Sequence, residues 1–424
     1  MGSLRPTHKS ETRVDIALLA SALFLQRFNL PFSGKFLALD FVFAALILVH
    51  QFASGRLVIR YDRLFWFLPA ALAVTCSLLL NFNTTMLTSY SQFMVLFSLV
   101  TLSRPSTADR YKSTLRVFQL LVMLLSCLAV AQFVAQLVVD GRKLIMFYWV
   151  FPDFLLPQPE AFAPTVHSNM NTIIPIYAGS SLIKSNGIFL VEPSALSQVT
   201  AIGILIEVLE FRRPRYLLVI VLGFLMAYSG TGLMTLLLFL PFAGLRHSRA
   251  GLSALLVVTF ALGLLATGII NLSIFLGRIG EFETNGGSGF GRFVVPLLLA
   301  AKHLDTAFLP ALLVGSGPGT ANNFTDTFYG GSSPCWFKLF YEYGVIGSFI
   351  FVCFFASCLR RSRCPGPALA ALVFTFIFHG SLITSYLLTM IIVLCTLHDP
   401  EPRRGRIVDP RRYAPPLVVG SAIG

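Results

Sequence analysis

The sequence carries little charge. Only 12% of its 424 residues are Asp, Glu, Lys or Arg, whereas 55% are hydrophobic and the mean hydropathy is +0.77. A soluble domain usually has about twice that charged fraction. A chain this apolar cannot cover a water-facing surface, so we predict a membrane protein whose solvent is lipid.

Acidic residues are especially scarce. The 19 Asp and Glu residues stand against 32 Lys and Arg residues, which leaves a formal net charge of +13. In a soluble protein this balance would suggest a nucleic-acid partner. Here the basic residues lie between apolar segments, where they set the orientation of membrane helices. We therefore expect the lipid bilayer as a partner, and no nucleic acid.

Paired cysteines and metal-ligand spacings are missing too. The seven cysteines are dispersed, and only Cys335 falls in a predicted outer loop, so no disulfide is expected. No CxxC motif or cluster of His and Cys suggests zinc, and no cofactor is predicted. Residues 1–13 are basic and lead into an apolar stretch without a small-residue cleavage site, which indicates a retained first helix.

Apolar stretches recur along the whole chain. They are residues 14–32, 36–53, 64–80, 86–103, 114–139, 194–211, 216–229, 231–245, 251–276, 338–359, 366–380 and 382–397. This pattern predicts an all-α polytopic membrane protein of about 12 transmembrane helices, although four stretches are shorter than the ~17–25 residues of a typical span. Helices 1–5 would lie in residues 1–139, helices 6–9 in 194–276, helices 10–12 in 338–397, and a tail in 398–424.

Basic clusters alternate with pairs of these stretches. The clusters are Arg5/Lys9/Arg13, Arg56/Arg60/Arg63, Arg104/Arg110/Lys112/Arg116, Arg212/Arg213/Arg215, Arg246/Arg249, Arg360/Arg361/Arg363 and Arg403/Arg404/Arg406. The positive-inside rule places all seven in the cytoplasm, together with both termini. Two of the opposite links are long, residues 140–193 and 277–337. Loops of this length are uncommon unless functional or disordered, so we expect two periplasmic caps that carry the chemistry.

The predicted spans contain almost no ionisable residues. A proton-coupled transporter would keep acidic or His residues near the midplane, and no inverted repeat with broken helices is recognisable. This disfavours ion-coupled transport. Among the histidines, His379 near an outer helix end is slightly more suggestive than those at cytoplasmic ends.

Each long loop contains charged residues with two interpretations. In the first loop, Glu192 precedes Pro193 at a helix start, where a carboxylate complements the helix dipole or acts as a base at the membrane surface. In the second loop, Arg278 and Arg292 are not needed for orientation. Arg is a good phosphate ligand, and pairing with loop carboxylates is the structural alternative.

Two glycine runs, residues 286–291 and 315–319, also lie in the second loop. Successive backbone N–H groups in such runs can cradle phosphate. Neither run fits a P-loop, and most glycine runs in loops are turns. Both interpretations therefore stay open.

Three stretches in a fixed order resemble the O-antigen polymerase and ligase superfamily, specifically the Wzy-type polysaccharide polymerases. The first runs from Ser185-Asn186-Gly187 to Glu192-Pro193-Ser194, the second is Ser229-Gly230-Thr231-Gly232, and the third leads from Arg292 through Gly315-Ser316-Gly317-Pro318-Gly319 to Glu342-Tyr343-Gly344. The likeness covers roughly residues 180–360. The ligase branch usually has a His-Asn pair about ten residues before Glu-x-Gly, where this chain has Ser333-Pro334. That departure favours a chain-extending exopolysaccharide polymerase.

The resemblance implies a metal-independent glycosyltransferase with a GT-C-like membrane fold. It would move a growing glycan from undecaprenyl diphosphate to a lipid-linked repeat unit at the outer face of the bacterial inner membrane, in exopolysaccharide or O-antigen biosynthesis. Arg292, Glu192 and Glu342 are then catalytic candidates, since the leaving diphosphate needs a cation and the attacking hydroxyl needs a base. The implied diphosphate and sugar contacts are Arg278, Lys184, Gly315, Gly317, Gly319 and Trp336.

Two alternatives remain. One is an O-antigen ligase-type glycosyltransferase, and the other is a flippase or transporter for the same lipid-linked oligosaccharide. Whether a co-polymerase that determines chain length is a further partner stays open.

Overall fold

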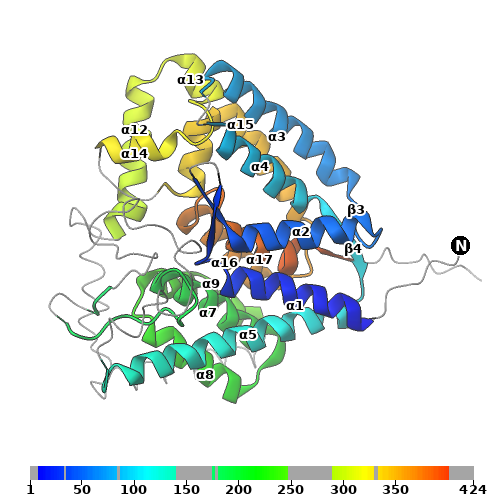
Figure 1. Ribbon diagram of the computed structural model, residues 1–424, viewed down its shortest axis with the longest axis vertical. Coiled ribbons are helices and arrows are strands. Elements are labelled where there is room, and N and C mark those ends of the chain that lie inside the picture. The colour runs from blue at the N-terminus through cyan, green and yellow to red at the C-terminus, as the bar shows by residue number, and fades with distance from the viewer. Residues whose placement is uncertain are drawn as a thin grey trace, which may run out of the picture.

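The described part of the chain is a helical bundle, as predicted (Figure 1). It is a computed structural model that describes residues 8–32, 35–83, 86–139, 174–176, 180–246, 289–328 and 333–400. The α-helices are α1 (His8–Phe24), α2 (Leu39–Ala53), α3 (Tyr61–Leu80), α4 (Met86–Val100), α5 (Ala108–Ala135), α7 (Pro193–Ile206), α8 (Pro214–Met226), α9 (Gly230–Arg246), α12 (Val295–Thr306), α13 (Leu309–Val314), α14 (Ala321–Phe328), α15 (Cys335–Leu359), α16 (Gly366–Phe374) and α17 (Ser385–Ile391). Short π-helical segments are η4 (Glu207–Phe211), η5 (Phe290–Val294), η6 (Thr375–His379) and η7 (Ile392–Thr396).

The outer surface of the bundle is apolar. Leu46 of α2, Phe65 of α3 and Phe349 of α15 each leave more than half of their surface exposed. Water would not stabilise so many large apolar side chains on one molecule, whereas lipid does. The exposed faces therefore agree with a membrane protein.

Four described helices are long and apolar enough to cross a bilayer. They are Tyr61–Leu80, Ala108–Ala135, Pro193–Phe211 and Cys335–Leu359. The other expected spans within the described residues form shorter apolar helices of 10–17 residues or, in the first case, α1. The expected span 251–276 lies outside the described residues. The count of about twelve crossings and the GT-C-like architecture are thus not confirmed.

The first expected helix is shorter than predicted. It ends at Phe24, and the chain then forms an antiparallel hairpin of β1 (Asn29–Phe32) and β2 (Lys35–Ala38). Pro31 disfavours helical backbone at Leu30 and suits the extended strand that forms there. The all-α prediction therefore needs correction for short strands.

A second small sheet lies at the end of the bundle where the basic clusters meet. It contains β3 (Val58–Ile59), β4 (Leu102–Ser106) and β5 (His398–Pro400), in the order β3-β4-β5. Arg363 donates to the carbonyl of Ser106 at 2.7 Å, and Arg361 lies 4.0 Å from Asp62. The clusters near residues 60, 104 and 360 thus share one end, as the even number of crossings predicted. In Figure 1, β3 and β4 lie on the right, whereas α12 and α14 lie on the left.

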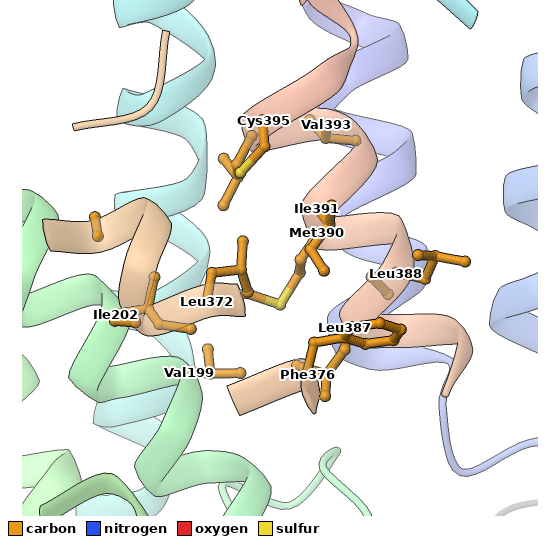
Figure 2. Packing of buried hydrophobic residues seen from close by; sticks show 14 of the residues in the cluster. Val199, Ile202, Leu372, Phe376, Leu387, Leu388, Met390, Ile391, Val393 and Cys395 are labelled. Atoms are coloured by element: carbon orange, nitrogen blue, oxygen red, sulfur yellow. The ribbon is translucent and has the colours of Figure 1, made fainter. Parts of the chain in front are cut away.

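α7 forms the centre of the core. Every residue of α7 is buried, and α8, α9 and α16 pack around it. Figure 2 shows Val199 and Ile202 of α7 close to Leu372, with Met390 of α17 beside it. Because α7 begins directly after Glu192, a fully packed helix fixes the backbone at that carboxylate.

Candidate functional site

The two long loops meet at an ion pair. The Nη2 atom of Arg292 lies 2.9 Å from both carboxylate oxygens of Glu192, a residue 100 positions earlier in the chain. Ser194 donates a further hydrogen bond from its hydroxyl to the same carboxylate. The structure therefore joins two residues that the sequence places in separate loops.

Glu192 was expected either to complement the dipole of its helix or to act as a base at the membrane surface, and its contacts bear on this choice. Glu192 is the N-cap residue of α7, yet its side chain makes no capping hydrogen bond to the helix. Its carboxylate turns to Arg292 instead. Helix capping is thus not what orients this side chain.

The pair is accessible. The exposed fractions of the Arg292 and Glu192 side chains are 20% and 31%. Partly exposed pairs stabilise a fold by only about 0–1 kcal/mol, so an incoming anion can take the place of Glu192 at small cost. Within the described residues, the other guanidinium nitrogens of Arg292 make no hydrogen bond.

The stretch before Glu192 is locked into the bundle. Ser185 donates from its hydroxyl to the carbonyl of Ala129 at 3.0 Å, and Asn186 exchanges two hydrogen bonds of 3.2 Å with the side chain of Gln132. Gly187 has a φ of +66°, which favours glycine. This part of the motif therefore acts as a rigid anchor for Glu192. Lys184 is buried at its start.

Arg27 anchors the same loop. Its Nη1 atom donates to the carbonyl of Ile188 at 2.7 Å, and the arginine is buried. No local sequence feature connects Arg27 with this loop, because the contact spans 161 positions.

The Ser229–Gly232 motif holds α9 against α7. The backbone N–H of Gly232 donates to the Ser197 hydroxyl at 3.1 Å, and a Cβ atom at Gly232 would meet the Ser197 carbonyl oxygen at 2.3 Å. Ser197 lies about one turn into α7. The motif therefore supports the helix that carries Glu192.

Glu342 lies in a second cluster with the glycine run of residues 315–319. Its carboxylate accepts hydrogen bonds from the backbone N–H groups of Gly319 and Ala321, at the start of α14. The backbone N–H of Gly317 donates to the Glu342 carbonyl at 3.1 Å. The anion held by this run is thus an internal carboxylate.

The backbone conformation and close packing of this run require glycine. Gly315, Gly317 and Gly319 all have positive φ angles, and a Cβ atom at Gly315 would meet the Glu342 carbonyl oxygen at 2.2 Å. The backbone N–H of Gly315 already donates to the Ala311 carbonyl at 2.8 Å. These contacts are those of a tightly packed turn, and phosphate binding by the run stays a prediction.

Trp336 lies in an apolar cluster that adjoins both sites, since the cluster includes Phe290, two residues before Arg292, and Ala321, whose backbone N–H bonds Glu342. Trp336 packs beside Phe337 in a small apolar cluster with Val295 and Leu299 of α12. Arg278 lies outside the described residues. No group of three or more His, Cys, Asp or Glu side chains that could hold a metal ion occurs in the part of the chain that the structure describes.

Two residues near the ion pair were missed by the sequence analysis. Tyr386 of α17 lies within electrostatic range of Glu192, Arg292 and Asp40. Asp40, at the start of α2, accepts a 2.6 Å hydrogen bond from Ser385. Nothing in the local sequence of Asp40 indicates that α2 and α17 are neighbours.

Comparison with protein families gives a match over nearly the whole chain. The family of WcaD colanic acid polymerases matches residues 17–399. The chain belongs to this family. It is therefore a Wzy-type polysaccharide polymerase, as the resemblance of the three motifs predicted, and an enzyme of the glycosyltransferase type. No curated protein matches the chain.

The match extends the likeness beyond residues 180–360 to the N-terminal helices. It supports membrane-bound exopolysaccharide synthesis over the ligase and flippase alternatives.

Proposed function

We propose that this polymerase transfers a growing glycan from undecaprenyl diphosphate to the sugar of a lipid-linked repeat unit at the outer face of the bacterial inner membrane. Both chain termini would then lie in the cytoplasm. The family name makes colanic acid repeat units the first substrate to test. The observation that carries the proposal is the accessible Arg292–Glu192 pair, where the two long loops meet.

In the proposed reaction, the acceptor hydroxyl oxygen attacks the anomeric carbon of the donor sugar. The bond from that carbon to the diphosphate oxygen breaks, and undecaprenyl diphosphate leaves with the electron pair. The proton of the hydroxyl passes to the Glu192 carboxylate. Arg292 binds the diphosphate and stabilises its growing charge.

The ion pair explains how one site prepares both groups. Without substrate, Arg292 and Glu192 neutralise each other. A bound diphosphate competes for the guanidinium and releases the carboxylate, which then accepts the proton. Arg278 and Lys184 are proposed as additional cationic contacts, and Trp336 as a sugar contact. A role of Glu342 as a base is the weaker proposal, since the start of α14 already occupies its carboxylate.

The test uses purified full-length protein and lipid-linked repeat units. Arg292→Ala should lower the rate of ladder formation about 10²–10³-fold, the usual effect of losing one stabiliser of transition-state charge. Arg292→Lys should retain part of the activity, because lysine keeps the charge but not the planar donor set. Arg361→Ala is the matched control, since Arg361 is 57% exposed and lies at the opposite end of the bundle.

A full ladder from Arg292→Ala would overturn the site assignment. A flippase is distinguished in cells, because loss of a polymerase leaves single repeat units on the outer face and loss of a flippase traps them inside. Reporter fusions at both termini test the orientation.

A further inference from the structure

Four unpartnered polar atoms occur in residues 375–381 of the described chain, a segment whose His379 lies beside Arg292. They are the hydroxyl oxygen of Thr375, both ring nitrogens of His379 and the hydroxyl oxygen of Ser381. All are shielded from solvent, and none has a hydrogen-bond partner among the described residues. The segment 375–381 thus holds 4 of the 16 such atoms in the described chain, so unpartnered polar atoms are concentrated here.

The backbone of this segment is well satisfied. The N–H of Gly380 donates to the Thr375 carbonyl at 2.9 Å, and the N–H of Ser381 donates to the Thr384 hydroxyl at 2.7 Å. A buried polar group without a partner costs free energy and calls for a ligand, water or functional reason. The unsatisfied atoms are therefore a feature of the side chains, not of a badly formed turn.

His379 lies next to the ion pair. Its ring centroid is 5.1 Å from that of Phe293, the residue after Arg292, and 5.4 Å from that of Phe374. Arg292 is close enough to act on the imidazole electrostatically. Thr375 is four positions before His379 in η6, which places both side chains on nearly the same face.

The chemistry of these groups indicates their ligand. A buried imidazole without a counter-charge is neutral, so one nitrogen donates and the other accepts. Two hydroxyls add further groups that donate and accept. A diphosphate only accepts hydrogen bonds, and the lone pair of the imidazole would repel it. A sugar hydroxyl both donates and accepts, so it matches the whole set.

We infer that His379, Thr375 and Ser381 form a subsite for hydroxyl groups of the sugar next to the diphosphate, and thereby hold the reacting sugar beside Arg292 and Glu192. This inference rests on the proposed function. The subsite has no charge of its own, so it contributes to sugar binding and orientation, whereas Arg292 binds the anion.

His379→Phe is the decisive variant, and Thr375→Val is a second variant that removes one hydroxyl of the same subsite. Phenylalanine keeps an aromatic ring between Phe293 and Phe374 but removes both nitrogens. We expect the thermal melting midpoint in detergent to stay the same or rise, because two unsatisfied buried atoms disappear. The KM for the lipid-linked repeat unit should rise about tenfold, and about threefold for Thr375→Val.

His303→Phe is the matched control. His303 is also buried, its Nε2 atom is also unpartnered, and aromatic rings of Phe340 and Tyr341 surround it. It lies eleven residues beyond Arg292 along η5 and α12, roughly 15 Å away. We expect a similar effect on the melting midpoint and an unchanged KM.

Ligand binding separates this inference from the proposed function. Lipid-linked repeat units should raise the melting midpoint of the unmodified protein, and His379→Phe should lose most of that shift. An unchanged KM in a folded His379→Phe protein would overturn the subsite, as would equal losses in His379→Phe and His303→Phe. If the unmodified protein binds repeat units but forms no ladder, the proposed function fails and the subsite stands.

Discussion

Glu192 and Glu342 were indistinguishable as catalytic candidates in the sequence, but their surroundings differ. The Glu192 side chain is 31% exposed and faces an arginine, whereas Glu342 is buried and accepts backbone hydrogen bonds from the start of α14. A base needs access to the proton that it removes. The same residue type therefore has a reactive setting in one place and a supporting one in the other.

Glutamine substitutions at these positions should have opposite effects. Glu192→Gln keeps the shape but cannot take a proton, so kcat should fall about 10²–10⁴-fold with little change in melting midpoint. Glu342→Gln replaces the carboxyl that accepts hydrogen bonds from the start of α14, so it should lower stability by about 1–3 kcal/mol while kcat is largely kept. Polymerisation rates and thermal melting midpoints of both variants show which glutamate is needed for kcat and which for stability. A large loss of kcat in a stable Glu342→Gln protein would restore Glu342 as a catalytic candidate.

The buried histidines predict a pH dependence of stability. Burial lowers the pKa of His303 below its ordinary value of 6.5, and burial likewise lowers the pKa of His398 despite the opposite effect of Asp15. The unfolded chain then binds protons that the native protein excludes. Stability should thus be fully present above pH 6.5 and decline as the pH falls below it. Melting midpoints from pH 8 to pH 5 test this, and His303→Phe should flatten the curve.

At the scale of elements, α15 and the 315–319 turn fit together through their glycines. Gly344 interrupts α15 with φ 65° and ψ −171°, and a Cβ atom there would lie 2.4 Å from the Leu313 backbone of α13. The Glu-x-Gly motif thus ends in a glycine because α13 passes directly against the kink. A conformation this far from the usual regions costs about 1–3 kcal/mol for other residues.

Gly344→Ala should fail to accumulate as folded protein. The free-energy cost of the positive φ and the cost of the clash with the Leu313 backbone are added together in this variant. Gly55→Ala is the control: Gly55 also has a positive φ, of 69°, but nothing lies within 4 Å of its Cβ position. That variant should lose only about 1–2 kcal/mol. Membrane yield and size-exclusion profiles compare the two. A well-folded Gly344→Ala protein would show that α13 can move away from the kink.

At the scale of the molecule, a buried ion pair joins α1 to the end of the bundle that holds β4 and β5. Arg104 lies 2.5 Å from Asp15 of α1, and His398 contacts the same carboxylate at 3.2 Å. These side chains connect the first helix with the last strand. Arg104 was expected to set membrane orientation, and the structure adds a carboxylate partner that orientation does not require.

Arg104→Ala should destabilise the protein by about 3–5 kcal/mol, because it leaves Asp15 buried without its cation. Arg110→Ala is a matched change nearby. The Arg110–Glu11 pair, at 2.7 Å, is more exposed on its arginine side, at 22%, and its loss should cost about 1 kcal/mol or less. Thermal melting of both variants in detergent measures the difference. Equal small losses would mean that β4 and β5 hold the ends together without Arg104.

The sequence alone determined the apolar helices and the common end of the basic clusters near residues 60, 104 and 360, and it directed the search for a site to the two long loops. These follow from local composition and charge, since lipid selects apolar helices and orientation selects where Arg and Lys lie. Only the tertiary structure decided that Arg292 pairs with Glu192, that Glu342 fills the glycine turn, and that His379 lies beside the pair. Such contacts join residues up to 100 positions apart, and helix packing, which local sequence does not encode, brings them together.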